Sequence, residues 1–258
     1  MKRIRVIVSL LLCITFCSYA LGEEKKNLNI VFIGNSITQG ALLEDPRHDA
    51  PPVKAALFLR KQPTGGTVRY SNQGVSGSTT LDFLPQNESL FPKVVQVADQ
   101  FRDETWATLI FSIMLGTNDS AITGPNGAPV SPSDYYGNMK SIVDRLLALY
   151  PDCKIVLHRP VWYSPNTYNG AKYLEEGLNR LQSYYSQLQA LVLDYSKRFP
   201  GQVFMGDTEG FDYFKTHYET ELFPEEGNAG TFYLHPNKKG AAALGELWGK
   251  AIQKVIGN

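Results

Sequence analysis

The stretch NIVFIGNSITQG, residues 29–40, decides the fold of this chain. Its first half is an apolar run, Ile30 to Ile33, in which β-branched residues predominate, and such a run is typical of a strand buried inside a sheet. The run stops at Gly34, and the residues that follow are ordinary turn formers. A turn at the end of a buried strand places the Ser36 hydroxyl at the edge of the sheet where α/β proteins bind their ligands. A serine on a turn carries little weight alone, so its partners must come from the ends of other strands.

The rest of the chain repeats this pattern of short apolar runs separated by amphipathic helices. Runs bounded by Gly, Pro, Asn or Asp predict buried strands at residues 29–33, 67–70, 108–114, 154–157 and 202–205. Apolar residues at helical spacing occupy residues 139–150, 178–195 and 244–255. Strands that alternate with helices pair in parallel and are covered by helices on both faces. The sequence therefore predicts an α/β fold with five parallel strands, and no repeat or long linker divides it into more than one domain.

The first 22 residues have the layout of a secretory signal peptide. Three basic residues lie within the first five positions, an apolar run covers residues 6–16, and small residues follow at Ala20 and Gly22 before the charged residues 23–26. The apolar run is shorter than the roughly 20 residues that a membrane-spanning helix needs. We therefore expect a signal peptide over residues 1–22 with cleavage near Gly22, and a mature domain over residues 23–258. This layout also predicts export to the periplasm or the medium, without stable insertion in a membrane.

The charge and cysteine content exclude several classes of protein. The predicted signal peptide holds three of the 25 basic residues and no acidic one, which leaves 22 basic against 25 acidic residues in the mature chain. A chain so close to neutrality is not expected to have nucleic acid as its main partner. Two of the three cysteines lie in the signal peptide, so Cys153 has no partner for an intrachain disulfide. The sequence shows no metal-ligand spacing and no phosphate or dinucleotide motif, so we expect no metal and no cofactor.

Three further motifs follow the predicted strands in chain order. SNQGVSG, residues 71–77, carries glycines that let the backbone approach a ligand and aim an amide group at it. LGTND, residues 115–119, presents the side-chain amide of Asn118. LHPNKKG, residues 234–240, presents His235 at the start of the last predicted helix. Together with the serine turn, these motifs are expected to meet at one crevice.

In order and content, the four motifs resemble those of the SGNH hydrolases, also called the GDSL family, and the match extends from residue 30 to the last helix. The resemblance implies a three-layer α/β/α flavodoxin-like fold with a five-stranded parallel sheet. It also implies that the four functional residues are Ser36, Gly74, Asn118 and His235. The segments 111–119 and 232–237 are similar to those of bacterial proteins grouped with sialate O-acetylesterases.

The resemblance implies a serine esterase. Ser36 is then the nucleophile, and His235 takes its proton and returns it to the leaving alcohol. The backbone N–H groups of Ser36 and Gly74 and the side chain of Asn118 form the oxyanion hole, in which one donor typically lowers the barrier by about 3 kcal/mol. Water then hydrolyses the acyl-serine.

The sequence departs from the family at the residue that orients the histidine. Members usually carry an acid three residues before the histidine, and this chain has Phe232 there. Three candidates remain for this role: a backbone carbonyl, which would make a Ser-His dyad, Asp207 at the end of the fifth predicted strand, and Glu225 or Glu226 in the loop before the histidine. We favour the dyad, because a turn or helix-cap role suits Asp207 better.

The expected substrate is an acetyl or other short acyl ester on a glycan, with xylan, pectin and sialic acid as candidate carriers. Two aromatic-rich insertions, residues 124–136 and 159–173, either pack on the surface or contact this substrate. Arg159 is able to bind the carboxylate of an acidic sugar, although a structural role is more common for a residue at a strand end, as for its neighbour His158. Two alternatives stay open: a lipase or thioesterase that prefers longer acyl chains, and a glycan-binding protein that has lost turnover. The sequence predicts no oligomeric state.

Overall fold

The protein is described by a computed structural model that covers residues 25–257, so the predicted signal peptide lies outside the described residues. The central sheet consists of β1 (Lys26–Gly34), β2 (Gly65–Gly74), β3 (Thr108–Met114), β4 (Lys154–Leu157) and β5 (Val203–Met205). These strands pair in parallel in the order β2-β1-β3-β4-β5. The prediction of five parallel strands is therefore confirmed.

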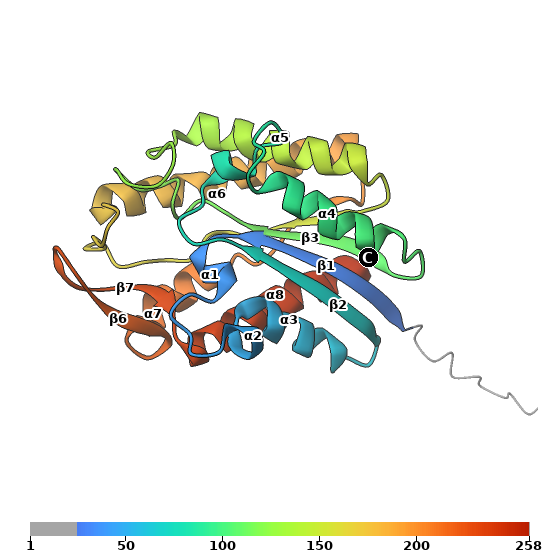
Figure 1. Ribbon diagram of the computed structural model, residues 1–258, viewed down its shortest axis with the longest axis horizontal. Helices are drawn as coiled ribbons and strands as arrows, with labels where there is room; N and C mark the ends of the chain where they lie inside the picture. The colour runs from blue at the N-terminus through green and yellow to red at the C-terminus, as the bar shows by residue number, and fades with distance from the viewer. Residues whose placement is uncertain (1–24, 258) are drawn as a thin grey trace, which may run out of the picture.

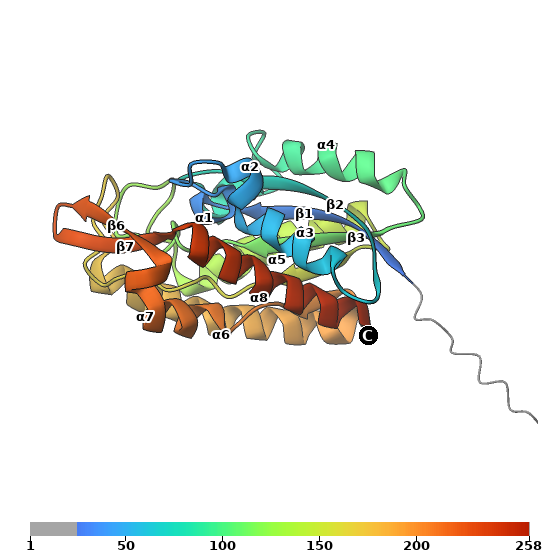
Figure 2. The same ribbon diagram turned by 90° about the horizontal axis from the view of Figure 1, so that it is seen from below.

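Helices cover both faces of the sheet (Figure 1). One face carries α4 (Phe91–Arg102), α5 (Pro132–Leu149) and α6 (Leu174–Arg198). The other face carries α3 (Pro51–Arg60), α8 (Lys238–Gly257) and, beside α8, α7 (Gly210–Glu221), as Figure 2 also shows. The predicted three-layer α/β/α fold is confirmed. Within residues 25–257, no helix is long and apolar enough to cross a membrane.

The strands form because their apolar side chains pack against helices on both faces of the sheet. Phe32 of β1 is fully buried and stacks on Trp248 of α8, with ring centroids 5.9 Å apart. Toward the opposite layer, Phe111 of β3 contacts Tyr150 at the end of α5, with centroids 5.5 Å apart. The apolar run that begins the deciding stretch is thus the centre of the core.

The helices predicted at residues 139–150, 178–195 and 244–255 lie within α5, α6 and α8. The buried face of α6 includes Leu181, Tyr184, Leu188 and Leu191. Tyr184 stacks on Tyr135 of α5 with centroids 4.1 Å apart, and this contact fixes the rotation of α6 about its axis.

An antiparallel hairpin, β6 (Leu222–Gly227) and β7 (Gly230–Pro236), stands apart from the central sheet (Figure 1). The sequence placed Glu225 and Glu226 in a loop before the histidine and predicted no strand over residues 222–236. Two prolines and two glycines interrupt this segment, and both residue types are depleted in strands, so no strand pattern is visible there. The hairpin precedes α8, and its second strand carries His235.

The strand order fixes where a ligand can bind. The chain passes from β1 to β2 on one side and then returns to β3 on the other, which makes a topological switch point between β1 and β3. In open α/β sheets, ligands bind at the carboxyl ends of the strands beside such a point. Ser36 follows β1 and Asn118 follows β3, so both residues emerge at this crevice.

His158 follows β4 and has the structural role that the sequence suggested. Its ring is buried, Nδ1 accepts the Asp207 backbone N–H at 2.9 Å, and Nε2 therefore carries the proton that is donated to Ser112 Oγ at 2.8 Å. Burial lowers the pKa of His158 to about 3, from an ordinary value of 6.5. The imidazole is therefore neutral in the folded protein at neutral pH.

The depressed pKa of His158 makes a prediction about acid stability. Between pH 6.5 and about 3, the unfolded chain binds a proton at this histidine and the folded chain does not, so this residue lowers the free energy of unfolding as the pH falls. His158→Gln keeps one acceptor and one donor but does not titrate. We expect the stability of wild type relative to the variant to fall by about 3 kcal/mol from pH 7 to pH 4.

Urea denaturation of both chains at the two pH values measures this difference. Asp119 and Asp207 have buried carboxyls whose pKa values are raised to about 6, so they raise the free energy of unfolding as the pH falls. Both residues are present in wild type and variant, so their effect cancels in the comparison. A difference that does not change with pH would contradict the assignment of a neutral, buried His158.

Candidate active site

Ser36 is placed by the tight turn between β1 and the short helix α1 (Ser36–Gln39). Asn35 is the N-cap of α1, and its Oδ1 accepts the Ile37 N–H at 3.1 Å. Gly34 is required for close packing, because a Cβ there would collide with the Thr38 side chain and would lie 2.9 Å from the carbonyl oxygen of Met114. Since Ser36 is the first residue of the helix, its own N–H has no acceptor within α1.

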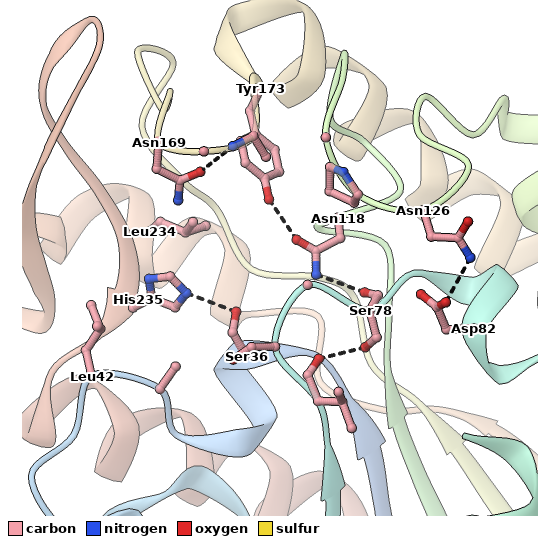
Figure 3. Close-up of a pocket in the computed structure, with 18 of the residues that line it drawn as sticks. Ser36, Leu42, Ser78, Asp82, Asn118, Asn126, Asn169, Tyr173, Leu234 and His235 are labelled. Carbon is pink, nitrogen blue, oxygen red and sulfur yellow. Dashed lines mark hydrogen bonds between the residues drawn. The ribbon is translucent and has the colours of Figure 1, made fainter. Parts of the chain in front are cut away.

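His235, at the end of β7, reaches Ser36 from the far end of the chain. Its Nε2 lies 2.9 Å from Ser36 Oγ (Figure 3). The side chain of His235 is only 11% exposed. The structure thus brings together the two residues that the sequence predicted as nucleophile and base.

Glu225 of β6 holds the other side of the imidazole. Its Oε1 lies 2.9 Å from His235 Nδ1 and also accepts the backbone N–H of His235 at 3.1 Å. A carboxylate at Nδ1 requires a proton on that nitrogen, which leaves Nε2 as the acceptor for the Ser36 hydroxyl. The structure therefore places Glu225, one of the alternatives that the sequence left open, at Nδ1 of His235, where the favoured Ser-His dyad would have a backbone carbonyl.

Asp207, another of the candidates for the orienting acid, makes its hydrogen bonds away from His235. Its Oδ1 accepts the Glu209 N–H at 2.9 Å, and both carboxylate oxygens lie 3.3 Å from the Gly210 nitrogen at the start of α7. Burial raises the pKa of the Asp207 carboxyl to about 6. Its carboxylate thus accepts N–H groups at the start of α7, whose N-cap residue is Glu209, and this agrees with the turn or cap role that the sequence favoured.

The hairpin explains how a glutamate replaces the acid expected at position 232. Glu225 and Phe232 are directly paired across β6 and β7. The register shifts between the next two pairs, Pro224 with Tyr233 and Leu222 with Pro236. These pairs are two residues apart along β6 and three residues apart along β7, so β7 holds one extra residue. Such an extra residue re-aims neighbouring side chains, and here it lies at His235. The acid is therefore supplied from the strand opposite Phe232.

Asn118, at the end of the β3 segment, is held in one orientation by two buried partners. Its Nδ2 donates to the carbonyl oxygen of Ser78 at 2.8 Å, and its Oδ1 accepts the hydroxyl of Tyr173 at 2.7 Å (Figure 3). Because a carbonyl oxygen only accepts, the amide nitrogen must face Ser78. The second hydrogen on Nδ2 remains available for a ligand in the crevice.

Gly74 does not fit the oxyanion role that the sequence predicted for it. Its N–H donates to Asn72 Oδ1 at 2.9 Å, and the residue does not line the cavity. A Cβ on Gly74 would collide with the backbone nitrogen of Gln39, so this glycine lets β2 end against α1. Gly77 lines the cavity instead, has a φ of +78°, and its N–H finds no acceptor among the described residues.

These groups open onto a cavity of about 810 Å³. The lining combines apolar side chains, among them Ala41, Leu42, Val75 and Leu90, with polar ones. Polar side chains of the lining come from η1 (Thr80–Phe83) and from the two insertions that the sequence singled out, and they include Asp82, Asn126 and Asn169 (Figure 3). Ser36, Asn118, Glu225 and His235 all belong to the lining.

The aromatic residues of the second insertion mostly pack in the interior. Trp162 and Tyr163 are buried, and Tyr173 alone among its tryptophans and tyrosines also lines the cavity. Arg159 lies outside the cavity: its guanidinium stacks over Phe211 at 4.0 Å, and its Nη1 lies 3.5 Å from a carboxylate oxygen of Asp212. The structural role suggested for Arg159 therefore agrees with its contacts.

The geometry supports acyl transfer to a serine. A hydroxyl is hydrogen-bonded to an imidazole that a carboxylate orients, and unpaired N–H groups face the same cavity. In the described part of the chain, no group of three His, Cys, Asp or Glu side chains is arranged to hold a metal ion.

Comparison with known proteins identified a family and a set of similar folds. The model of the GDSL-like lipase/acylhydrolase family matches residues 32–243. A carbohydrate acetylesterase from Sinorhizobium meliloti superposes with a TM-score of 0.60 at 17% identity, over 89% of this chain and 100% of that protein. An acetylxylan esterase from Geobacillus stearothermophilus has a TM-score of 0.58 at 18% identity, over 92% and 97% of the two chains.

The aryl esterase of M. smegmatis also has a TM-score of 0.58, at 16% identity over 88% of this chain and 99% of that one. A search of curated protein sequences gave no match. At such identities the solved structures show a shared fold.

Proposed function

Because the chain belongs to the GDSL-like lipase/acylhydrolase family, we propose that it is an exported serine esterase that removes acetyl and other short acyl groups from carbohydrate. One observation carries the proposal. Ser36 Oγ is hydrogen-bonded to His235 Nε2, and His235 Nδ1 to Glu225 Oε1, each at 2.9 Å, on the wall of an 810 Å³ cavity. This is the geometry that activates a serine hydroxyl.

In the proposed reaction, Ser36 Oγ attacks the ester carbonyl carbon while its proton passes to His235 Nε2. The tetrahedral intermediate collapses when the imidazolium returns this proton to the departing sugar hydroxyl, which leaves an acyl-serine. Water then attacks the acyl group with His235 as base, and carboxylic acid and free Ser36 are the products. Glu225 stabilises the imidazolium in both halves of the cycle.

The oxyanion hole in this proposal consists of the Ser36 N–H, the Gly77 N–H and the Asn118 side chain. Gly77 takes the place that the sequence gave to Gly74, because it faces the cavity with an unpaired N–H. Preorganised donors of this kind lower the barrier by about 3 kcal/mol each, since they need no reorganisation when the negative charge develops.

The carbohydrate part of the proposal is supported by the cavity. Its lining includes amide and carboxylate groups that suit sugar hydroxyls, and its volume lies in the range of small-molecule sites. Proteins of similar fold include a carbohydrate acetylesterase and an acetylxylan esterase. A short acyl group requires no long apolar channel.

Acetate release from a panel of acetylated glycans by the purified mature chain tests this function. A series of nitrophenyl esters from acetyl to octanoyl tests the acyl preference, and we expect the rate to fall with chain length. A preference for octanoyl would identify a lipase or thioesterase. Glycan binding without acetate release would identify a binding protein that has lost turnover.

Export is the second part of the proposal, and it is supported by the signal-peptide layout of residues 1–22. The full-length chain, expressed in a bacterium with a functional secretion system, is expected outside the cytoplasm with a new N-terminus near Gly22. Intact-mass measurement of each cell fraction tests this. A full-length chain confined to the cytoplasm would contradict it.

Tyr173 positions the oxyanion donor Asn118, so Tyr173→Phe will lower kcat about tenfold, which is the effect of losing one buried hydrogen bond. KM will stay within about twofold, since the amide acts on the transition state more than on the bound ester. Steady-state kinetics on a soluble acetyl ester measure both constants. Tyr168→Phe, on the same insertion, is the matched control, because no hydrogen bond is recorded for its hydroxyl among the described residues.

A fall in kcat of equal size for Tyr168→Phe would show that the loop, and not the Asn118 hydrogen bond, is responsible. An increase in KM alone would assign Tyr173 to substrate binding.

A further inference from the structure

The charged side chains that line the cavity all carry the same sign. Asp82 and Glu225 belong to the lining, and no lysine or arginine does among the described residues. His235 is the one other titratable side chain there besides the Tyr173 phenol. The cavity is therefore an anionic site in a chain whose basic and acidic residues are equal in number.

The nearby cations are held elsewhere. Lys172 lies between two lining residues, but its Nζ is 5.8 Å from the centre of the Tyr168 ring. Close to His235 in sequence, Lys238 pairs with Asp49 at 3.0 Å, and Lys239 pairs with Glu221 at 2.8 Å. No described cation is therefore directed into the cavity to compensate its two carboxylates.

Asp82 is fixed in this position. Its Oδ2 accepts the Thr79 N–H at 2.8 Å, and its Oδ1 accepts Asn126 Nδ2 at 2.8 Å (Figure 3). Oδ2 also lies 3.2 Å from the Thr79 hydroxyl, whereas Oδ1 has the one partner Asn126 among the described residues. A carboxylate oxygen has about two lone-pair sites, so Oδ1 has room for a further donor. A sugar hydroxyl is such a donor, whereas a substrate carboxylate has no proton to offer and carries a like charge.

We propose that this cavity selects acetyl esters on neutral sugars and disfavours those on sugars that bear a carboxylate, and that Asp82 is the residue that sets this selectivity. The inference rests on the proposed esterase function and narrows it: neutral xylan-type or mannan-type carriers are favoured, and the acidic carriers pectin and sialic acid are not. Two like charges at the distances of a cavity wall are expected to lower kcat/KM for the anionic ester by about tenfold.

Three matched substrates test the charge effect. They are an acetylated methyl glucoside, the corresponding glucuronate and the corresponding glucuronamide, which has the shape of the glucuronate without its charge. We expect kcat/KM for acetate release to be similar for the glucoside and the amide, and about tenfold lower for the glucuronate. Raising the salt concentration to about 0.5 M should shrink this ratio, because exposed charges are then screened.

Two substitutions test the residues. Asp82→Asn removes the charge and should raise the glucuronate rate relative to the amide several-fold. Ser89→Lys adds a cation to the same lining at an exposed position whose hydroxyl has no recorded partner among the described residues, so it should raise this relative rate without disturbing the turn at Thr79. Ser89→Gln, a long neutral side chain, should leave the relative rate within about twofold of wild type.

The two proposals fail in different ways. If the Ser36→Ala chain still releases acetate from the glucoside, the esterase function itself is wrong. If release depends on Ser36 but the three substrates react equally, with no response to salt or to Ser89→Lys, the charge selectivity alone is overturned. If Ser89→Gln changes the ratio as much as Ser89→Lys, the effect is steric and the electrostatic inference is again overturned.

Discussion

Ser36→Ala will lower kcat for acetate release by about 10⁶-fold, the loss seen when the nucleophile of a serine triad is removed. The variant keeps the cavity and the other oxyanion donors, so a residual rate of about 10³-fold above the uncatalysed reaction is expected. The fold should be unaffected, because the Ser36 hydroxyl is hydrogen-bonded to His235 alone among the described side chains. Rates on an acetyl ester and thermal unfolding of both chains measure the two effects.

Covalent labelling gives the same prediction a second readout. An alkyl phosphonate ester should add one phosphonyl group to the peptide that contains Ser36 in wild type and none in Ser36→Ala. Acetate release by Ser36→Ala at a tenth of the wild-type rate or more would contradict a nucleophilic Ser36, as would phosphonylation of another residue.

The fold was predictable because its signals are local. The apolar run from Ile30 to Ile33 is bounded by a glycine, and the central strands β3 and β4 carry similar buried apolar runs, whereas the edge strand β2 buries Val68 alone. Burial on both faces of the sheet demands such runs, so sequence and structure report the same constraint. The hairpin of β6 and β7 was not predicted, because its prolines and glycines interrupt the apolar pattern that is typical of a strand. Pairing between the two strands holds the hairpin together.

The sequence predicted the site residues correctly where a single residue type can carry the chemistry. The prediction failed where the backbone geometry decides between two neighbouring residues of the same type. Ser36 and His235 lie at strand ends and meet, as expected. Gly74 and Gly77 share one motif, and only the backbone distinguishes the glycine whose N–H is bonded within the loop from the one with a φ of +78° at the cavity. The sequence had no signal for that difference.

Glu225 illustrates the same limit. A sequence displays fixed spacings, and Phe232 stands at the spacing where the family carries its acid, so Glu225 was one of several open candidates. Glu225 lies ten residues from His235 along the chain and reaches it because the hairpin pairs it with Phe232. The register shift beside His235 completes the approach, and a register is a property of two strands together.

Glu225→Ala will lower kcat by about 10⁴-fold, the cost of losing the acid in serine protease triads. Glu225→Gln will lower kcat less, by about 10²-fold. The amide can still orient the imidazole, but it cannot supply the negative charge. The His235 backbone N–H, which donates to Oε1 at 3.1 Å, needs an acceptor, so the amide oxygen should take that place and keep the proton on Nδ1. The charge that stabilises the imidazolium is lost.

Kinetics on an acetyl ester for both variants and for Glu226→Ala test this division between orientation and charge. Glu226 is the matched control, since it is exposed and its recorded hydrogen bond is to Thr231 Oγ1 at 2.9 Å, away from the imidazole. We expect the control to stay within about twofold of wild type. Equal losses in the Ala and Gln variants would mean that charge alone matters. Full activity in Glu225→Ala would mean that the contact seen at Nδ1 is not used, and that Ser36 and His235 work as a dyad after all.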